Sequence, residues 1–324
     1  MTLLDSIHLY RHIIKSDKRV IDDFNKQSLN EFHNCKLYNW WADGAYLWFA
    51  QRYSSFLEAQ NQRISFCSVF GEREVLGHIN GIKVFFSGEN IHNHPYDMYS
   101  DYLLQDKSTN LALGFEYFEN ERYMRFPLWI LYMFSPTSTR DDIYDRCKEL
   151  RFPRLFPKRH FCSMVASHDL NGLRYEMYDR LGSIAHISCA GRLLHNDDRL
   201  KNEFNDDKNT YIKEFAFNIC PENSNSYGYV TEKIFQAIAA GCIPIYWGSY
   251  NNPEPQIINH DAVIFWDRES DNNDVIKTIE RLYSSPKELD EFLHIPRLQD
   301  GAEEIIWELL NGLDKRISSL LLSK

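Results

Sequence analysis

Residues 218–249 constrain the fold more than any other part of the chain. They read NICPENSNSYGYVTEKIFQAIAAGCIPIYWGS: an apolar run, a polar loop, a helix-like segment, a glycine and a second apolar run. Apolar runs on either side of a helix are typical of buried parallel strands, because a helical crossover returns the chain to the same end of the sheet. The segment therefore predicts a βαβ unit.

The same alternation continues through the second half of the chain and, less regularly, through the first. In the second half, strand-like runs lie at residues 161–166, 184–188, 215–220, 242–247 and 262–266, and helix-like segments at 172–181, 229–240 and 274–283. In the first half, apolar runs lie at residues 36–41, 64–70, 82–86 and 110–115. Strands that alternate with helices favour parallel sheets, so we expect an α/β protein.

A basic stretch with two prolines, RFPRLFPKRH at residues 151–160, separates the two sets of runs. Proline stops elements on either side, so this stretch is the best candidate for an interdomain connection. We expect two α/β domains with a cleft between them: residues 1–155, which begin with a polar helical extension, and residues 156–324. Residues 303–322 carry apolar side chains on one face, which predicts an amphipathic helix that docks onto the body. Its return to the first domain is left open.

Charge and cysteine content narrow the partners and the compartment. The formal net charge of −10 argues against a nucleic-acid polymer, which needs a basic face, and weakly against an anionic membrane. The N-terminus lacks the apolar core of a signal peptide, and no run approaches the ~18 uncharged apolar residues of a membrane span. Seven scattered cysteines without a CxxC pair are typical of a reducing compartment. We expect a cytoplasmic protein with, at most, peripheral contact at the inner membrane face.

The loop at residues 222–228 leaves the carboxyl end of a predicted strand, where open α/β sheets bind ligands. The next helix is expected to begin near Val230 and Thr231, so its free N–H groups and positive dipole end point at that crevice. An anion bound there would neutralise Lys233 in the first turn, and Glu232 could bind a vicinal diol. In an arbitrary helix the simpler interpretation, a helix-start carboxylate beside a solvated lysine, would be preferred.

The full string changes that preference. The pattern ENSxSYGYVTEKIFxAIxAGxIPIYWG closely resembles the donor-binding signature of the α1,3/4-fucosyltransferases of glycosyltransferase family 10, above all the bacterial, Helicobacter-type enzymes. Further segments resemble the same family: NWWADG at 39–44, VFFSGEN at 84–90, RYMRFPLW at 122–129 and VASHDLNGLRYEMYDRL at 165–181. The resemblance implies a GT-B fold, in which two Rossmann-like domains face each other across a cleft, the acceptor domain first and the GDP-fucose domain second.

The resemblance assigns two catalytic carboxylates. Glu89, at the end of a predicted strand, matches the general base that takes the proton of the attacking sugar hydroxyl. Glu232 matches a carboxylate near the ribose and near the positive charge that develops on the sugar. The implied reaction is inverting transfer of L-fucose from GDP-β-L-fucose to O3 or O4 of N-acetylglucosamine, forming an α-linkage in lipopolysaccharide or another Lewis-type surface glycan.

The remaining expected site residues bind substrate. Arg174 matches the arginine that holds the donor pyrophosphate, a task suited to a planar, permanently charged fork. Phosphate contacts are expected from Tyr229 and Lys233, and a donor-site contact from Asn223. With 15% aromatic residues, some rings are expected to stack on the N-acetyllactosamine-type acceptor, and the candidates are Trp40 and Trp41.

No metal or other cofactor is expected, because local cations can neutralise the departing diphosphate and no DxD motif ends an apolar strand. Three alternatives stay open. A GT-B enzyme could use another nucleotide sugar, and a non-catalytic module could keep the fold without turnover. A metal-dependent hydrolase could use His92 and His94 with Asp97 near Glu89. Pro221 departs from the family, many of whose members carry an aromatic residue there. Linkage, natural acceptor and oligomeric state are not determined by these motifs.

Overall fold

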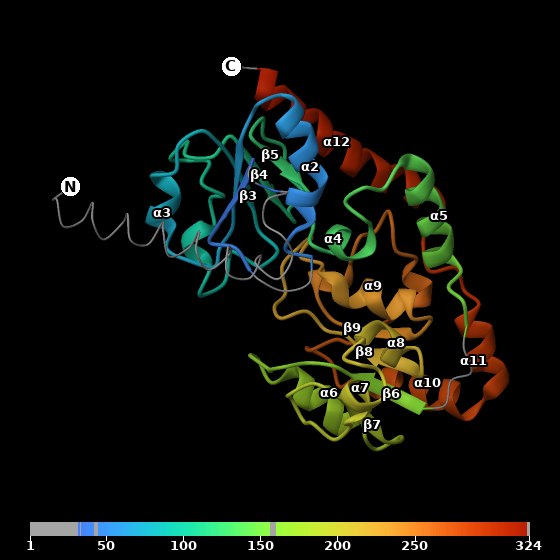
Figure 1. The fold of residues 1–324 in the computed structure, drawn as a ribbon. Helices are drawn as coiled ribbons and strands as arrows, with labels where there is room; N and C mark the ends of the chain where they lie inside the picture. The colour runs from blue at the N-terminus through green and yellow to red at the C-terminus, as the bar shows by residue number, and fades with distance from the viewer. Residues whose placement is uncertain (1–31, 33, 42–44, 156–159, 323–324) are drawn as a thin grey trace. The chain divides into compact units, whose positions relative to one another are not determined.

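The computed structural model describes residues 32, 34–41, 45–155 and 160–322 (Figure 1). The expected N-terminal helical extension and part of the NWWADG motif lie outside these residues. The chain packs as two compact units: unit 1 consists of Met1–Thr139 and Glu308–Lys324, and unit 2 of Arg140–Trp307. The expected connection at residues 151–160 lies within unit 2, and residues 156–159 of it lie outside the described part.

Unit 1 is built on a five-stranded sheet in the order β1-β2-β3-β4-β5, with every neighbouring pair parallel. The strands are β1 (Cys35–Tyr38), β2 (Ile64–Cys67), β3 (Ile82–Phe86), β4 (Leu111–Gly114) and β5 (Tyr123–Arg125). The helices are α2 (Trp48–Ala59), α3 (Arg73–Gly77), the 3-10 turn η2 (Asp97–Tyr99) and α4 (Trp129–Met133). Strands β2, β3 and β4 are buried along their whole length, as their apolar runs predict.

Unit 2 contains a second five-stranded parallel sheet, in the order β10-β9-β8-β6-β7. Its strands are β6 (His160–Met164), β7 (Ile187–Cys189), β8 (Phe215–Ile219), β9 (Ile243–Tyr246) and β10 (Ile264–Phe265). Its helices are α5 (Arg140–Arg151), α6 (Leu173–Leu181), α7 (Arg199–Asn202), α8 (Lys208–Ile212), α9 (Glu232–Ala239), α10 (Asn273–Ser284) and α11 (Pro286–Leu293), with 3-10 turns η3 (Ser249–Asn251) and η4 (His260–Ala262). The alternation predicted from the apolar runs is confirmed in this unit.

The order of the strands in unit 2 creates a switch point. From β6 the chain moves outward to β7, then returns to the other side of β6 to form β8 and continues to β9 and β10. The loops after β6 and β8 therefore turn in opposite directions, which opens a crevice at the carboxyl ends of these two adjacent strands. Figure 1 shows β6, β8 and β9 side by side, with α9 leading from β8 to β9.

The C-terminal amphipathic helix is present as α12 (Ala302–Leu322). Its residues from Glu308 onward belong to unit 1, where Asp314 accepts hydrogen bonds from Arg52 Nε at 2.8 Å and from the Tyr53 hydroxyl at 2.8 Å. Leu310, Leu313 and Ile317 are fully buried. Among the described residues, no helix combines the length and apolar character that crossing a membrane requires.

Candidate active site

The crevice at the switch point of unit 2 holds a pocket of about 200 Å³. Its walls come from the segments after β6 and β8 and from the starts of three helices, α6, α8 and α9. The lining residues are Val165, Ala166, Ser167, His168, Arg174, Lys208, Asn218, Ile219, Cys220, Pro221, Asn223, Glu232 and Lys233. Four of the residues expected to form the donor site, Arg174, Asn223, Glu232 and Lys233, therefore line one pocket.

Helix α9 begins where the sequence predicted, with Thr231 as the N-terminal cap. The Thr231 side chain accepts no capping hydrogen bond from the helix backbone. Instead, the Thr231 N–H donates to Glu222 Oε1 at 2.7 Å, and the Thr231 hydroxyl donates to Glu222 Oε2 at 2.6 Å. The Lys233 ammonium donates to Glu222 Oε2 at 3.1 Å and to the Thr231 hydroxyl at 2.7 Å. The Glu222 carboxylate is fully buried and neutralises Lys233 from behind the pocket.

Sequence reasoning missed Glu222 as a site residue. Its signal was its place three residues after β8, in the ENS turn, but nothing in the sequence says that the carboxylate points inward. The packing around it requires a glycine at position 248, where φ is +146° and an added Cβ would lie 2.7 Å from Glu222 Cγ. The glycine of the PIYWG string thus leaves room for the buried carboxylate.

Arg174 lies in the first turn of α6 and is 5% exposed. Its guanidinium donates to three neutral oxygens: the carbonyl of His168 at 2.9 Å, the carbonyl of Pro221 at 3.2 Å and Oδ1 of Asn223 at 3.0 Å. Burial lowers the pKa of Arg174, although nearby acidic groups oppose this effect. The side chain thus ties together the two loops of the switch point, and among the described residues no carboxylate accepts a hydrogen bond from its guanidinium.

The carboxylate of Glu232 lies 3.9 Å from the Lys233 ammonium and is 18% exposed. Burial would raise its pKa, but the charges of Lys233 and Lys208 outweigh burial and lower it. The pKa of Lys233 is raised, because Glu222 and Glu232 outweigh the opposing effect of burial. Glu232 is therefore ionised at neutral pH and can accept hydrogen bonds from sugar hydroxyls.

Lys208, the first residue of α8, also lines this pocket and was not predicted. Tyr229, which was predicted as a phosphate contact, is 1% exposed and is not among the lining residues. It nevertheless lies close enough to Arg174 to influence the pKa of the guanidinium. Its predicted contact with phosphate stays a prediction.

Glu89 lies in unit 1, in the loop that follows β3, where parallel α/β sheets place ligand-binding groups. The Ser87 hydroxyl donates to the Glu89 carbonyl oxygen at 2.7 Å, which fixes the backbone of this tight loop. Glu89 is half-buried, and its charge adds to burial in raising the pKa of Tyr96. The carboxylate is thus held at the carboxyl edge of the sheet of unit 1 with part of its surface accessible.

The histidines of the hydrolase alternative do not converge. His92 Nε2 contacts Glu116 Oε1 at 2.5 Å, whereas His94 is 91% exposed and lies 3.9 Å from Asp97. Within the described part of the chain, no group of three or more His, Cys, Asp or Glu side chains could hold a metal ion.

Trp40 and Trp41 stack on each other with ring centroids 4.6 Å apart. Trp40 is 1% exposed, and its indole N–H donates to the Tyr46 carbonyl at 2.8 Å, so it packs in the core of unit 1 and offers almost no surface to a ligand. Trp41 is half-buried and is the member of the pair with accessible surface. Residues 42–44, which complete the motif, lie outside the described residues.

Both parts of the chain match families of known proteins. Residues 157–297 match the family model for the C-terminal region of glycosyltransferase family 10 (fucosyltransferase), and residues 32–132 match that for the N-terminal domain of α-(1,3)-fucosyltransferase FucT. The α-(1,3)-fucosyltransferase FucT of Helicobacter pylori is 31% identical over 269 residues, which cover 69% of this chain and 53% of that protein. The chain thus spans about half the length of this curated relative.

Three crystal structures described as α1,3-fucosyltransferase share the fold. One has a TM-score of 0.61 at 24% identity and covers 88% of each chain. A second, with GDP, has a TM-score of 0.60 at 22% identity and covers 92% of this chain and 95% of that one. A third, with GDP-fucose, has a TM-score of 0.51 at 24% identity over 80% of this chain and 77% of that one. The α/β, GT-B-type fold predicted from the sequence is confirmed.

Proposed function

Because the chain belongs to the fucosyltransferases of glycosyltransferase family 10, we propose that it transfers L-fucose from GDP-β-L-fucose to a sugar hydroxyl. The observation that carries the proposal is the pocket at the switch point of unit 2, where Arg174, Lys208 and Lys233 meet the start of α9. A nucleoside diphosphate is the leaving group that such a site suits, since cations and free N–H groups stabilise a departing phosphate without protonating it.

The acceptor in this proposal is O3 or O4 of an N-acetylglucosamine unit in an N-acetyllactosamine-type glycan. The acceptor oxygen forms a bond to C1 of fucose while the bond from C1 to the β-phosphate oxygen breaks and its electron pair leaves with GDP. Attack from the opposite face inverts the β-linked donor to an α-linked product. Glu89 takes the proton of the acceptor hydroxyl, and Glu232 stabilises the positive charge that develops on the sugar ring.

The reaction in this proposal uses no metal ion. Arg174 and the N-terminus of α9 supply the charge compensation that a divalent cation would otherwise give. Transfer should therefore continue at full rate in excess EDTA, and a strict requirement for Mg²⁺ or Mn²⁺ would contradict this part of the proposal.

All seven cysteines are free and buried, which supports a reducing, cytoplasmic location for the proposed enzyme. The proposed partners are the donor nucleotide and the glycan, without nucleic acid. The product would enter lipopolysaccharide or another surface glycan of the Lewis type.

A donor and acceptor panel tests the proposal. The protein is incubated with GDP-fucose, GDP-mannose and UDP-sugars and with type-1 and type-2 lactosamine acceptors, and NMR identifies the new linkage. We expect transfer from GDP-fucose alone, with an α-anomeric product. Transfer from a different nucleotide sugar, or none from any of them, would contradict the proposal.

The role of Glu89 has its own test. We expect Glu89→Gln to lower kcat by about 10²–10⁴-fold, because general-base help is lost, and to leave the affinity for GDP unchanged. Glu119→Gln, at an exposed position of the same unit, is the matched control and should retain full activity. A Glu89→Gln variant with normal kcat would assign the proton to another group.

A further inference from the structure

Lys208 is one of the cations of the donor pocket. Neither the stability of its helix nor an ion pair explains why a lysine occupies this position. It begins α8, but the start of that helix is stabilised by Asp207, whose side chain accepts from the Thr210 N–H at 3.1 Å and from the Thr210 hydroxyl at 2.6 Å. The helix therefore needs no lysine at this position. The half-buried side chain of Lys208 instead lines the pocket beside Arg174, Glu232 and Lys233.

The other two cations of the pocket, Lys233 and Arg174, have hydrogen-bond acceptors within the protein. Lys233 is bound by the buried Glu222 carboxylate at 3.1 Å, and Arg174 donates to three neutral oxygens. The described residues provide no hydrogen-bond or ion-pair partner for the Lys208 ammonium. Glu232 acts on it electrostatically without pairing with it.

An ammonium held in this way is unfavourable in the empty pocket. Burial lowers the pKa of Lys208, Glu232 and Cys220 raise it, and the charges of Lys233 and Arg174 lower it further. An uncharged side chain would cost less there, since removing an ammonium from water without a partner is expensive. A lysine at such a position fits a ligand that brings negative charge.

We propose that Lys208 is a phosphate-binding residue that contacts the pyrophosphate of the bound nucleotide. This rests on the proposed function in taking the ligand to be a nucleoside diphosphate sugar. Because Lys233 is already matched by Glu222, Lys208 supplies positive charge that no carboxylate of the pocket neutralises by direct contact. Cleavage of the sugar–phosphate bond adds one negative charge to the pyrophosphate, so Lys208 stabilises the departing GDP more than the intact donor.

The experiment measures the affinities of GDP, GMP and guanosine by calorimetry for the wild-type chain and for Lys208→Met and Lys208→Arg. We expect Lys208→Met to weaken GDP binding by about tenfold or more, since charge-assisted hydrogen bonds to phosphate are lost, and to leave guanosine binding unchanged. Lys208→Arg should restore most of the GDP affinity. The matched control is Lys201→Met, an exposed lysine of the preceding helix α7 that does not line the pocket.

The outcomes separate the two proposals. If Lys208→Met binds GDP as tightly as the wild type, the role of Lys208 is overturned while the proposed function stands. If the wild-type chain binds UDP rather than GDP, the fucosyl donor is wrong and the same comparison, made with UDP, UMP and uridine, still decides the role of Lys208. If the wild type binds none of these nucleotides, both are overturned. Equal losses for GDP and guanosine would show that Lys208 only shapes the pocket.

A second measurement follows the uptake of protons when GDP binds. The pyrophosphate should raise the lowered pKa of Lys208, so that in alkaline solution below the ordinary lysine pKa of 10.5 GDP binding is accompanied by proton uptake. Calorimetry in two buffers of different ionisation enthalpy measures this uptake. It should be smaller in Lys208→Met than in the wild type, and equal uptake in both would argue against the contact.

Discussion

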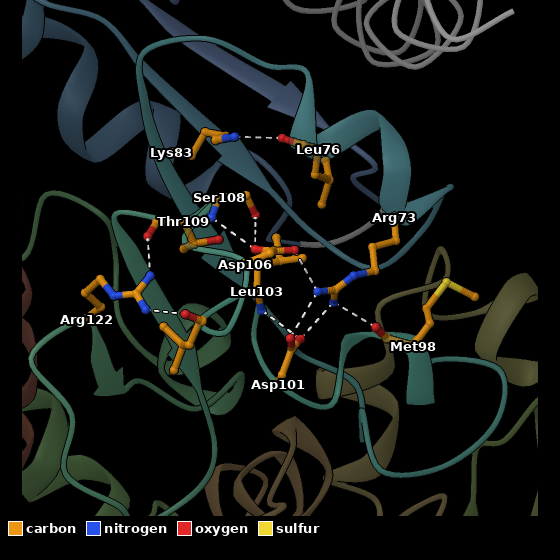
Figure 2. A network of polar contacts seen from close by, with 11 residues as sticks. Arg73, Leu76, Lys83, Met98, Asp101, Leu103, Asp106, Ser108, Thr109 and Arg122 are labelled. Atoms are coloured by element: carbon orange, nitrogen blue, oxygen red, sulfur yellow. Dashed lines mark hydrogen bonds and ion pairs between the residues drawn. The ribbon is translucent and has the colours of Figure 1, made fainter. Parts of the chain in front are cut away.

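Two groups of charged side chains, one in each unit, differ in whether every cation has a hydrogen-bond acceptor. In the unit 1 network, Arg73 donates to both oxygens of Asp101, at 2.8 and 3.1 Å, and to Asp106 at 2.9 Å (Figure 2). Lys83 donates to the Leu76 carbonyl at 2.8 Å, and Arg122 donates to the carbonyl of Thr109 at 3.2 Å. Each of these cations has its acceptors within the network.

The donor pocket of unit 2 leaves its cations short of acidic partners. Arg174 has neutral acceptors only, Lys208 has no direct partner among the described residues, and Lys233 alone is bound by a carboxylate at hydrogen-bond distance. Neutral acceptors alone do not distinguish the two units, because Lys83 and Arg122 also donate only to carbonyl oxygens. The difference is Lys208, which has no hydrogen-bond or ion-pair partner among the described residues and is therefore available to an anion from solution.

Removing Glu222 should have the largest effect, because it turns the one matched cation of the pocket into an unmatched one. We expect Glu222→Ala to lower the free energy of unfolding by about 3–5 kcal/mol, since the buried end of Lys233 loses its counter-charge. Urea denaturation measures the loss. The double variant Glu222→Gln with Lys233→Met should recover part of it, and a single-variant loss below about 1 kcal/mol would contradict the pairing.

Arginine substitutions in the two units should give different kinds of defect. Arg174→Met should weaken GDP binding by about 10- to 100-fold, the loss expected for charge-assisted bonds to phosphate. Arg73→Met should leave GDP binding unchanged and lower the free energy of unfolding by about 1 kcal/mol, because its pairs are partly exposed. Calorimetry measures GDP binding and urea denaturation measures stability for both variants. Weaker GDP binding in Arg73→Met, or a loss of stability in Arg174→Met with normal GDP binding, would contradict this prediction.

Lysine substitutions should change stability in opposite directions. Without nucleotide, Lys208→Met removes an unpartnered ammonium and should raise the free energy of unfolding by up to about 1 kcal/mol. Lys83→Met removes a donor from the Leu76 carbonyl and should lower it by about 1 kcal/mol. Thermal unfolding with and without GDP provides the measurement. A destabilised Lys208→Met would mean that Lys208 is structural.

Acid should weaken the unit 1 network slightly, because its carboxylates become protonated. Burial would raise the pKa of Asp106, but hydrogen bonds from Ser108 and the charge of Arg73 lower it below its ordinary 3.8. A carboxylate with a lowered pKa stabilises the folded state above the unfolded pKa, and this contribution is lost as the pH falls through the folded pKa. The difference in stability between wild type and Asp106→Asn should thus be constant near neutrality and shrink below about pH 3.8. A difference unchanged at lower pH would contradict the lowered pKa.

Much of the fold was predictable because apolar runs determine buried parallel strands. Strand β5 was missed, since three residues with only Tyr123 buried give no run. In the site, the motif brought Arg174, Asn223, Glu232 and Lys233 to one pocket, and their individual roles stay predictions. The direction of a side chain depends on tertiary packing, so the sequence did not reveal that Glu222 points into the core, that Lys208 points into the pocket, or that Trp40 is covered.

Unit 1 is assembled from two separate segments of the chain, and this has a consequence for folding during synthesis at the ribosome. Its sheet is complete once Arg125 has been made, but Arg52 and Tyr53 receive their partner Asp314 only from α12, which follows all of unit 2 in the sequence. Arg316 similarly donates to the Glu121 carbonyl at 2.5 Å. Unit 2 is contiguous and can fold as it emerges, whereas the nascent unit 1 keeps an uncovered surface until α12 has been translated. Unit 1 begins first in the sequence but is completed only after unit 2.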